Sequence, residues 1–310
     1  MDFLQRLAAG NVDRDVGRLV YTQYLNPSGG IETDLTIVRL DEEKFRCVCG
    51  SAFVYSDLGW MQMNAPTDGS VLIDDVTEDY SCLALWGPRS RDILSVVTDD
   101  EVSNEAFPYL SSRTLCVNGS EVWAQRVSYC GELGWELYVA AGEASALWKA
   151  LMTAGADHGI TPAGYRAIDS LRMEKAYRYW GSDITPETSP LEAGLGFCVS
   201  FKKDADFIGR EALLAQREAP TERRLCTLTV KADPFGLHGG EAIYADGTLV
   251  GRITSAAWGY TLEENIAMSY LSDELAVEGT VLEVDLFGER TPAVVTADVL
   301  YDPASTKLKA

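Results

Sequence analysis

The C-terminal part of the chain contains only predicted strands, and this feature restricts the fold more than any other. After a polar joint at residues 219–224, segments rich in β-branched and aromatic residues alternate with turns, and Asp246-Gly247 is a hairpin signal. The segments are LCTLTV, EAIYADGTLVGRITSAAWGY, NIAMSYL, VLEVDLF and PAVVTADVLY. Strands alone, in this number, predict a small antiparallel β-barrel. We therefore divide the chain into residues 1–220 and a barrel domain over residues 221–310.

The region before the joint mixes strands with helices. A hairpin is predicted around the NPSGG turn, with strands at residues 20–25 and 35–40. Residues 44–86 are interpreted as strand-like segments with polar connections, and residues 116–139 as further strands. Helices are predicted at the N-terminus, after Gly87-Pro88, and over GEASALWKALMTAGADHG, where apolar residues recur at helical spacing. This order of elements predicts an α+β fold with ferredoxin-like layers.

Composition excludes several classes of function. The chain has 310 residues, with 26 Lys and Arg against 47 Asp and Glu, and a net charge of −21. Because so acidic a chain repels phosphate backbones, we expect no nucleic-acid partner. No apolar run reaches the length of a membrane helix, and the N-terminus lacks the apolar core of a signal peptide, so we expect no membrane partner. The seven cysteines are interpreted as buried thiols in a reducing cytosol, which predicts a cytoplasmic protein.

Residue spacing argues against metal and dinucleotide sites. The two histidines, His158 and His238, are far apart, and the one-residue gap between Cys47 and Cys49 suits neither a zinc site nor a redox C-x-x-C motif. No G-x-G-x-x-G follows a predicted strand, and the chain has neither a Walker loop nor a G-x-S-x-G motif. We therefore expect no metal, and no flavin or nicotinamide bound by this chain.

Residues 161–210 interleave charged with aromatic side chains. A helix is predicted there, with Thr161 as its cap, Pro162 in its first turn and Gly181 at the end of the regular structure. The helix would deliver charged residues beside an aromatic run: Arg172, Glu174, Lys175, then Tyr177, Tyr179 and Trp180. Such a set suits a flat, polar heterocycle. A solvated helix end over a core aromatic cluster explains the same spacing.

The run LRMEKAYRYWGSDI…ETSPLEAGLGF…FIGREAL resembles the glycine-cleavage T-protein (aminomethyltransferase) family, whose signature is LR-x-E…G-x-D…T-x-P-x-E-A-G-L. It is most similar to the branch fused to dimethylglycine and sarcosine dehydrogenases. The hairpin also resembles the family's LN-x-x-GG-x-x-x-DL, and RVSYCGELGWE its R-x-x-YTGE-x-G-x-E. The resemblance implies a multidomain T-protein-like fold and tetrahydrofolate as cofactor. Family members usually begin with a further strand-and-helix region, which we expect to be missing here.

The resemblance also implies site residues. Asp34 is the candidate catalytic carboxylate at the reactive end of tetrahydrofolate, with Tyr21 lining the pocket beside it; the alternative for Asp34 is a carboxylate that satisfies turn amides. Tyr129 would line the ligand channel, or is an ordinary tyrosine at a sheet edge. Glu174 matches the family glutamate that pairs with the pterin N3–H and 2-amino group, or is a helix-end acid paired with Arg178.

One basic residue completes the predicted site. Lys203 occupies a position where relatives carry a basic residue near the glutamate tail of folate. Its neighbour Lys202 could serve instead, or both are simply solvated.

Three functions remain open at this point. The first is tetrahydrofolate-dependent one-carbon transfer from a methylated amine such as dimethylglycine or sarcosine, with a separate flavoprotein as partner. The second is a stand-alone tetrahydrofolate-dependent O- or S-demethylase. The third is a non-catalytic folate-binding protein, which ranks last because those relatives carry KGCYxGQE where this chain has EKAYRYWGSD.

Overall fold

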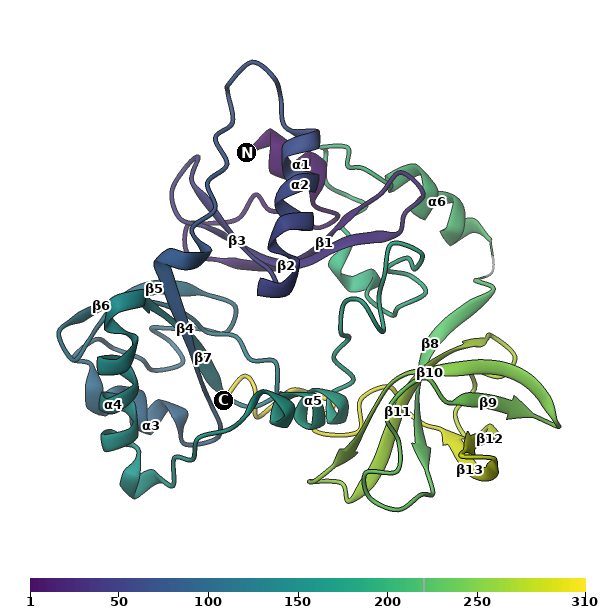
Figure 1. Ribbon diagram of the computed structural model, residues 1–310. Coiled ribbons are helices and arrows are strands. Elements are labelled where there is room, and N and C mark those ends of the chain that lie inside the picture. The colour runs from purple at the N-terminus through teal and green to yellow at the C-terminus, as the bar shows by residue number, and fades with distance from the viewer. Residues whose placement is uncertain (220) are drawn as a thin grey trace.

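Three β-sheets, each with its own hydrophobic core, build the molecule (Figure 1). The structure is a computed structural model that describes residues 1–219 and 221–310. A three-stranded sheet, a four-stranded sheet and a closed barrel form three lobes, and α5 (Tyr165–Glu174) lies between the second sheet and the barrel. The predicted α+β fold with a C-terminal antiparallel barrel is confirmed.

The first lobe is built on the predicted hairpin. Its sheet has the order β1-β2-β3. The Asn26 side chain closes the turn, because its Oδ1 accepts backbone N–H groups from Ser28 and Gly30, both at 3.0 Å. The second strand begins at Ile31, earlier than predicted. The elements of this lobe are α1 (Asp2–Leu7), β1 (Leu19–Leu25), β2 (Ile31–Arg39), β3 (Phe45–Val48) and α2 (Val54–Asn64).

The interpretation of residues 44–86 as strands with polar connections is wrong in its middle. Helix α2 occupies residues 54–64, and no strand forms at VLIDDV, although its residue types favour one. Residues 71–76 are mostly exposed and pair with no sheet, whereas Trp60 and Met61 of α2 pack on the core beneath the first sheet. A local β-propensity forms no strand without a neighbouring strand to pair with.

The second lobe is an antiparallel sheet of order β4-β7-β6-β5 with two helices on one face. Along β7, Trp135, Leu137 and Val139 point into the core under these helices. The intervening residues therefore point to the opposite face, where Tyr138 packs against the first lobe. The elements are β4 (Tyr80–Trp86), α3 (Ser90–Val97), β5 (Ser112–Val117), β6 (Ser120–Gln125), β7 (Gly134–Ala140) and α4 (Ala144–Ala154).

Helix α5 is shorter than predicted. It begins at Tyr165 with Gly164 at the N-cap position, while the Thr161 hydroxyl bonds back to the Gly159 carbonyl instead of capping. It ends at Glu174, because Ala176 adopts the left-handed conformation with φ 53°. The aromatic run that follows is therefore irregular chain. It leads through the 3-10 turn Gly196–Cys198 to α6 (Arg210–Glu218).

The third lobe is a closed six-stranded barrel of order β10-β11-β8-β13-β12-β9. Its strands are β8 (Arg223–Val230), β9 (Ala242–Ala245), β10 (Thr248–Gly259), β11 (Glu264–Ser272), β12 (Val281–Leu286) and β13 (Glu289–Val295). Asp246 and Gly247 both have positive φ, as the predicted hairpin requires. Beyond β13 the chain returns to α5, and the C-terminus lies near that helix (Figure 1).

The cysteines are not all buried, contrary to the prediction. None of the seven forms a disulfide, and Cys130, Cys198 and Cys226 are buried. Cys82 and Cys116 are exposed, because alternate residues of β4 and β5 point away from the core under the helices.

Candidate functional site

Asp34 lies in the first lobe with two partners on the facing strand. Gln23 is its register neighbour on β1, and the Gln23 Nε2 donates a hydrogen bond to Asp34 Oδ1 at 3.0 Å. The Tyr21 phenol, two residues earlier on the same face, also favours the ionised form of the carboxyl group and so lowers its pKa. Burial nevertheless raises the pKa of Asp34 to about 6. The carboxyl group can therefore carry or release a proton near neutral pH.

Tyr129 reaches the same region from the second lobe. Its hydroxyl donates to the Arg178 carbonyl, and its ring stacks on Tyr177 with 5.7 Å between centroids and 14° between planes. Burial raises the pKa of Tyr129, with Arg172 opposing the shift and Asp34 adding to it, which indicates that these charges lie near the phenol. The structure thus brings together three of the predicted site residues, Tyr21, Asp34 and Tyr129.

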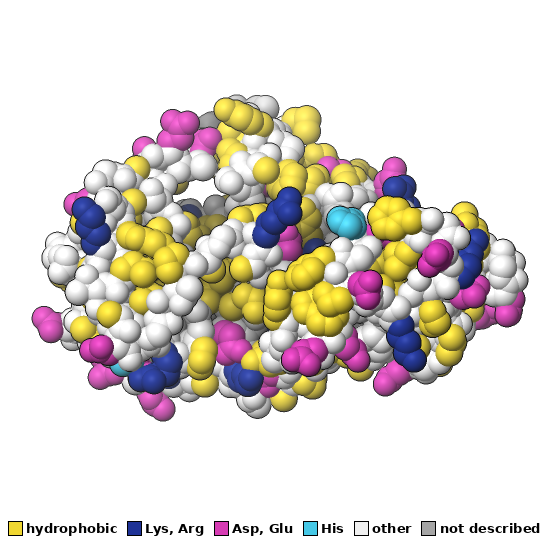
Figure 2. Space-filling view, turned by 60° about the horizontal axis from the view of Figure 1, so that its bottom comes forward, with side chains coloured by type: hydrophobic (Ala, Val, Ile, Leu, Met, Phe, Trp, Pro, Cys, Tyr) yellow, Lys and Arg dark blue, Asp and Glu magenta, His cyan; other side chains and the backbone are white. Residues whose placement is uncertain are grey.

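The segment after α5 closes this region. The pKa of the Cys198 thiol is raised to about 12 by burial, and both Gln23 and Asp34 affect it. The adjacent Phe197 ring lies 6.5 Å from the Tyr21 ring. We call Tyr21, Gln23, Asp34, Tyr129 and Cys198 the Asp34 site. The space-filling view shows a recess in the face that it turns forward, with hydrophobic side chains along it (Figure 2).

Glu174 lies elsewhere, against the barrel. Its side chain is 1% exposed, and its Oε1 accepts backbone N–H groups from Thr261 at 2.7 Å and Leu262 at 3.1 Å. Its carbonyl accepts the N–H of Tyr301 at 2.9 Å. In this arrangement Glu174 attaches the barrel and the returning chain to α5, and it forms no pair with Arg178.

Lys203 is also buried, unlike a residue that reaches for a ligand tail at the surface. Its Nζ donates to the carbonyls of Gln5 and Ala8, both at 2.6 Å, and of Gly10 at 3.0 Å, around the end of α1. Burial lowers the pKa of Lys203 to about 8. Lys202 is exposed and lines, with Arg217, a surface pocket of about 440 Å³.

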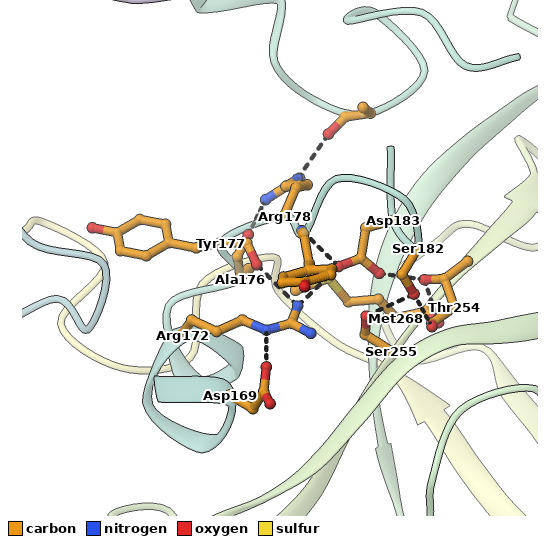
Figure 3. A network of polar contacts seen from close by, with 12 residues as sticks. Asp169, Arg172, Ala176, Tyr177, Arg178, Ser182, Asp183, Thr254, Ser255 and Met268 are labelled. Carbon is orange, nitrogen blue, oxygen red and sulfur yellow. Dashed lines mark hydrogen bonds and ion pairs between the residues drawn. The ribbon is translucent and has the colours of Figure 1, made fainter. Parts of the chain in front are cut away.

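The charged side chains of the signature segment form a polar network (Figure 3). Arg172 Nη1 donates to Asp183 Oδ2 at 2.8 Å, and both side chains are buried. Asp183 also accepts the Tyr179 N–H at 2.9 Å and the Thr254 hydroxyl of the barrel at 2.5 Å. The network therefore joins α5 to the barrel.

Sequence reasoning missed a second polar pair, Glu136 and Gln125. They are opposite each other on β7 and β6, on the face of the second sheet that the helices do not cover. Glu136 Oε2 accepts the Tyr138 hydroxyl at 2.7 Å, and burial raises the pKa of Glu136. Gln125 is 0% exposed, and neither polar atom of its side chain has a hydrogen-bond partner in the described chain. Unpaired buried amides are expected where a ligand or water completes the bonds.

This pair lies at the same end of the sheet as Tyr129. The loop that carries Tyr129 leads directly into β7, and Glu136 follows two residues after that strand begins. The alternation of apolar and polar residues along WELYV could have identified Glu136 from the sequence. This alternation places Glu136 on the face opposite to the core residues Trp135 and Leu137.

Two negative findings concern the described residues only. Within residues 1–219 and 221–310, no group of three or more His, Cys, Asp or Glu side chains is placed to hold a metal ion. In the same ranges, no helix is long and apolar enough to cross a membrane.

Comparison with known families agrees with this architecture. The chain matches the GCVT N-terminal domain over residues 1–203 and the glycine cleavage T-protein C-terminal barrel domain over residues 223–302. It belongs to the glycine-cleavage T-protein family. The T-protein homologue aminomethyltransferase T from Bartonella henselae, whose crystal structure is known, is 25% identical, with a TM-score of 0.85 over 97% of this chain and 81% of that one.

Two relatives of different length illustrate the range of the family. The aminomethyltransferase of Halothermothrix orenii is 36% identical over 285 residues, which are 92% of this chain and 78% of that protein. Human dimethylglycine dehydrogenase is also 36% identical, over 302 residues, but these are 96% of this chain and only 35% of that protein. The chain thus spans about a third of the length of these dehydrogenase relatives.

Proposed function

We propose that this chain transfers a one-carbon unit from a methylated amine, such as dimethylglycine or sarcosine, to tetrahydrofolate. The amine would be oxidised by a separate flavoprotein. The similarity to dimethylglycine dehydrogenase over 96% of the chain supports this class of substrate. The observation that carries the proposal is the Asp34 carboxyl group, partly buried beside aromatic side chains, with a pKa of about 6.

The side chains present fit a reduced folate. The stacked Tyr129 and Tyr177 rings offer an aromatic wall, and Tyr21 offers a second aromatic surface beside Asp34. A pterin also has an edge of N–H donors, which requires a carboxylate or amide oxygen. Glu136 and the unpaired amide of Gln125 supply such acceptors at the same end of the second sheet.

Each residue has a definable task. Bound tetrahydrofolate would supply the nucleophilic nitrogen that accepts the one-carbon unit. Asp34, ionised above its pKa of about 6, stabilises positive charge on the amine and can take up a proton. Gln23 and Tyr21 hold its carboxylate in place. The surrounding aromatic side chains exclude water, which strengthens the interaction of the carboxylate with a cation.

We assign the contact with the pterin edge to Glu136 in preference to Glu174. One oxygen of the Glu174 carboxylate is already occupied by two backbone N–H groups of the barrel. Turning Glu174 toward a ligand would leave those two amides without partners, which costs stability. Glu136 uses one oxygen for Tyr138 only. Lys203 is occupied in a comparable way, so a basic contact for the folate tail falls to Lys202.

Calorimetric titration with 5-formyltetrahydrofolate tests the proposal first. We expect micromolar binding by the wild-type chain and by Asp34→Asn. Dimethylglycine with tetrahydrofolate, a flavoprotein dehydrogenase and its electron acceptor should then yield methylenetetrahydrofolate instead of free formaldehyde, with wild type but not with Asp34→Asn. A folded sample that binds no reduced folate contradicts the whole proposal. Transfer from methoxy or methylthio compounds without a flavoprotein would favour the O- or S-demethylase. Folate binding without transfer from any of these compounds would favour a non-catalytic folate-binding protein.

A further inference from the structure

The buried Gln23 amide holds the Asp34 carboxyl group from the protein side. It is 0% exposed, lies directly opposite Asp34 in the β1–β2 register, and donates to Asp34 Oδ1 at 3.0 Å. Asp34 itself keeps partial exposure. The amide is therefore on the protein side of the carboxylate, and the other side remains for a reacting group.

The charge of Asp34 determines which way the Gln23 amide points. An ionised carboxylate can only accept hydrogen bonds, so the NH₂ end of the amide must face it. The Oε1 end is then directed away, and it has no hydrogen-bond partner among the residues that the structure describes. The Cys198 thiol lies next to the same amide and can offer only a weak S–H donor.

Packing alone does not explain a glutamine here. A methionine would fill the same volume in this buried strand, and it would leave no oxygen without a partner. The glutamine therefore costs stability, and costs of this kind are usually found where a residue serves a site. The cost is consistent with a role in holding Asp34.

Other groups around Asp34 oppose its charge. Burial disfavours the ionised form, and the Asp57 carboxylate on α2 adds repulsion. Gln23 opposes this by donating a hydrogen bond and Tyr21 by its nearby phenol, whereas Tyr129 and Cys198 are buried and neutral near pH 7. We propose that Gln23, backed by Cys198, is the positioning residue of the Asp34 site: it fixes the orientation of the Asp34 carboxylate and stabilises its charged form. This inference rests on the proposed function for Asp34.

The test measures the ionisation of Asp34 without any ligand. The free energy of unfolding is determined against pH in three backgrounds, each with and without Asp34→Asn: wild type, Gln23→Met, and the control Thr22→Val. Thr22 is equally buried on the other face of β1, where its hydroxyl accepts the Gly10 N–H at 2.7 Å. The difference within each pair changes between the pKa of Asp34 in the unfolded chain and its pKa in the folded chain, and a fit of this change gives the folded-state pKa, which we call the midpoint.

We expect the midpoint near pH 6 in wild type and in Thr22→Val, and about one pH unit higher in Gln23→Met. In transfer assays kcat should fall in Gln23→Met while KM changes little. The pH at which activity is half-maximal should rise by the same amount as the midpoint from the unfolding experiment. An unchanged midpoint in Gln23→Met overturns the inference. If that variant does not fold, Gln23→Glu is used instead, because it keeps the side-chain length. The new carboxyl group then faces Asp34, and the two groups should titrate together with a midpoint above pH 6. A single midpoint at pH 6 would contradict the inference.

The result is separable from that of the proposed function. The unfolding experiment uses the ligand-free chain. A shifted midpoint in Gln23→Met therefore shows that Gln23 stabilises the charged form of Asp34, even if no folate binds. Conversely, folate binding and transfer with an unchanged midpoint would retain the proposed function and reject the role of Gln23.

Discussion

Replacement of Asp34 by asparagine should make the chain more stable and inactive. Asparagine has the shape of the protonated carboxyl group and carries no charge that burial would disfavour. The folded-state pKa of Asp34 is about 6, against 3.8 for an exposed aspartate. Because each pKa unit corresponds to about 1.4 kcal/mol, ionised Asp34 lowers the free energy of unfolding by about 3 kcal/mol at pH 8.

The pH dependence gives this prediction its sign. Between pH 4 and 6 the folded chain binds more protons at Asp34 than the unfolded chain, so wild-type stability falls as the pH rises. Asp34→Asn should therefore match wild type near pH 4 and exceed it increasingly up to about pH 7. Urea unfolding followed by circular dichroism measures the difference at each pH. Asp99→Asn, at an exposed carboxylate, serves as the control and should show no such trend.

Two results would refute the reasoning. If the free energies of unfolding of Asp34→Asn and wild type differ by the same amount at pH 4 and pH 8, then ionisation of Asp34 does not destabilise the folded chain. A variant less stable than wild type at pH 8 would mean that the carboxylate contributes to folding, as in the turn-amide alternative, and does not serve catalysis. Retained transfer activity would separately exclude its catalytic role.

Three further predictions concern residues whose tasks the structure separates. Glu136→Gln should weaken 5-formyltetrahydrofolate binding about tenfold in calorimetry with little change in Tm, while Glu174→Gln should lower the free energy of unfolding by about 1–3 kcal/mol with similar affinity; the reverse pattern would restore Glu174 as the pterin contact. Asp183→Asn should lower the free energy of unfolding by about 3–5 kcal/mol, because Arg172 is then buried without its partner, and an unchanged Tm would contradict the ion pair. Lys203→Met should destabilise α1. Because the pKa of Lys203 is about 8 in the folded chain and 10.5 in the unfolded chain, the stability of wild type relative to this variant should rise from pH 8 to pH 10.5. A difference in urea unfolding that does not change with pH would show that burial does not lower the pKa of the lysine.

Much of the fold follows from local patterns that the sequence carries. The NPSGG turn and the Asp246-Gly247 turn specify hairpins because their residues adopt the turn conformations at low cost, and both hairpins form. The apolar spacing of residues 144–154 predicts α4 for the same local reason. The residues at the start of α5 show the limit, because Thr161 and Pro162 fit a helix start that the chain does not use.

The site depended on contacts between lobes, which local patterns do not encode. The hairpin alone places Tyr21 and Gln23 beside Asp34, so this part was accessible from the sequence. Whether Glu174 or Glu136 is available to a ligand depends on which backbone amides approach each carboxylate, and those amides come from distant segments of the chain. Lys203 likewise lies under the end of α1, more than 190 residues away in sequence. Residue types set what each side chain can do, and tertiary burial and pairing decide which of them remains available to do it.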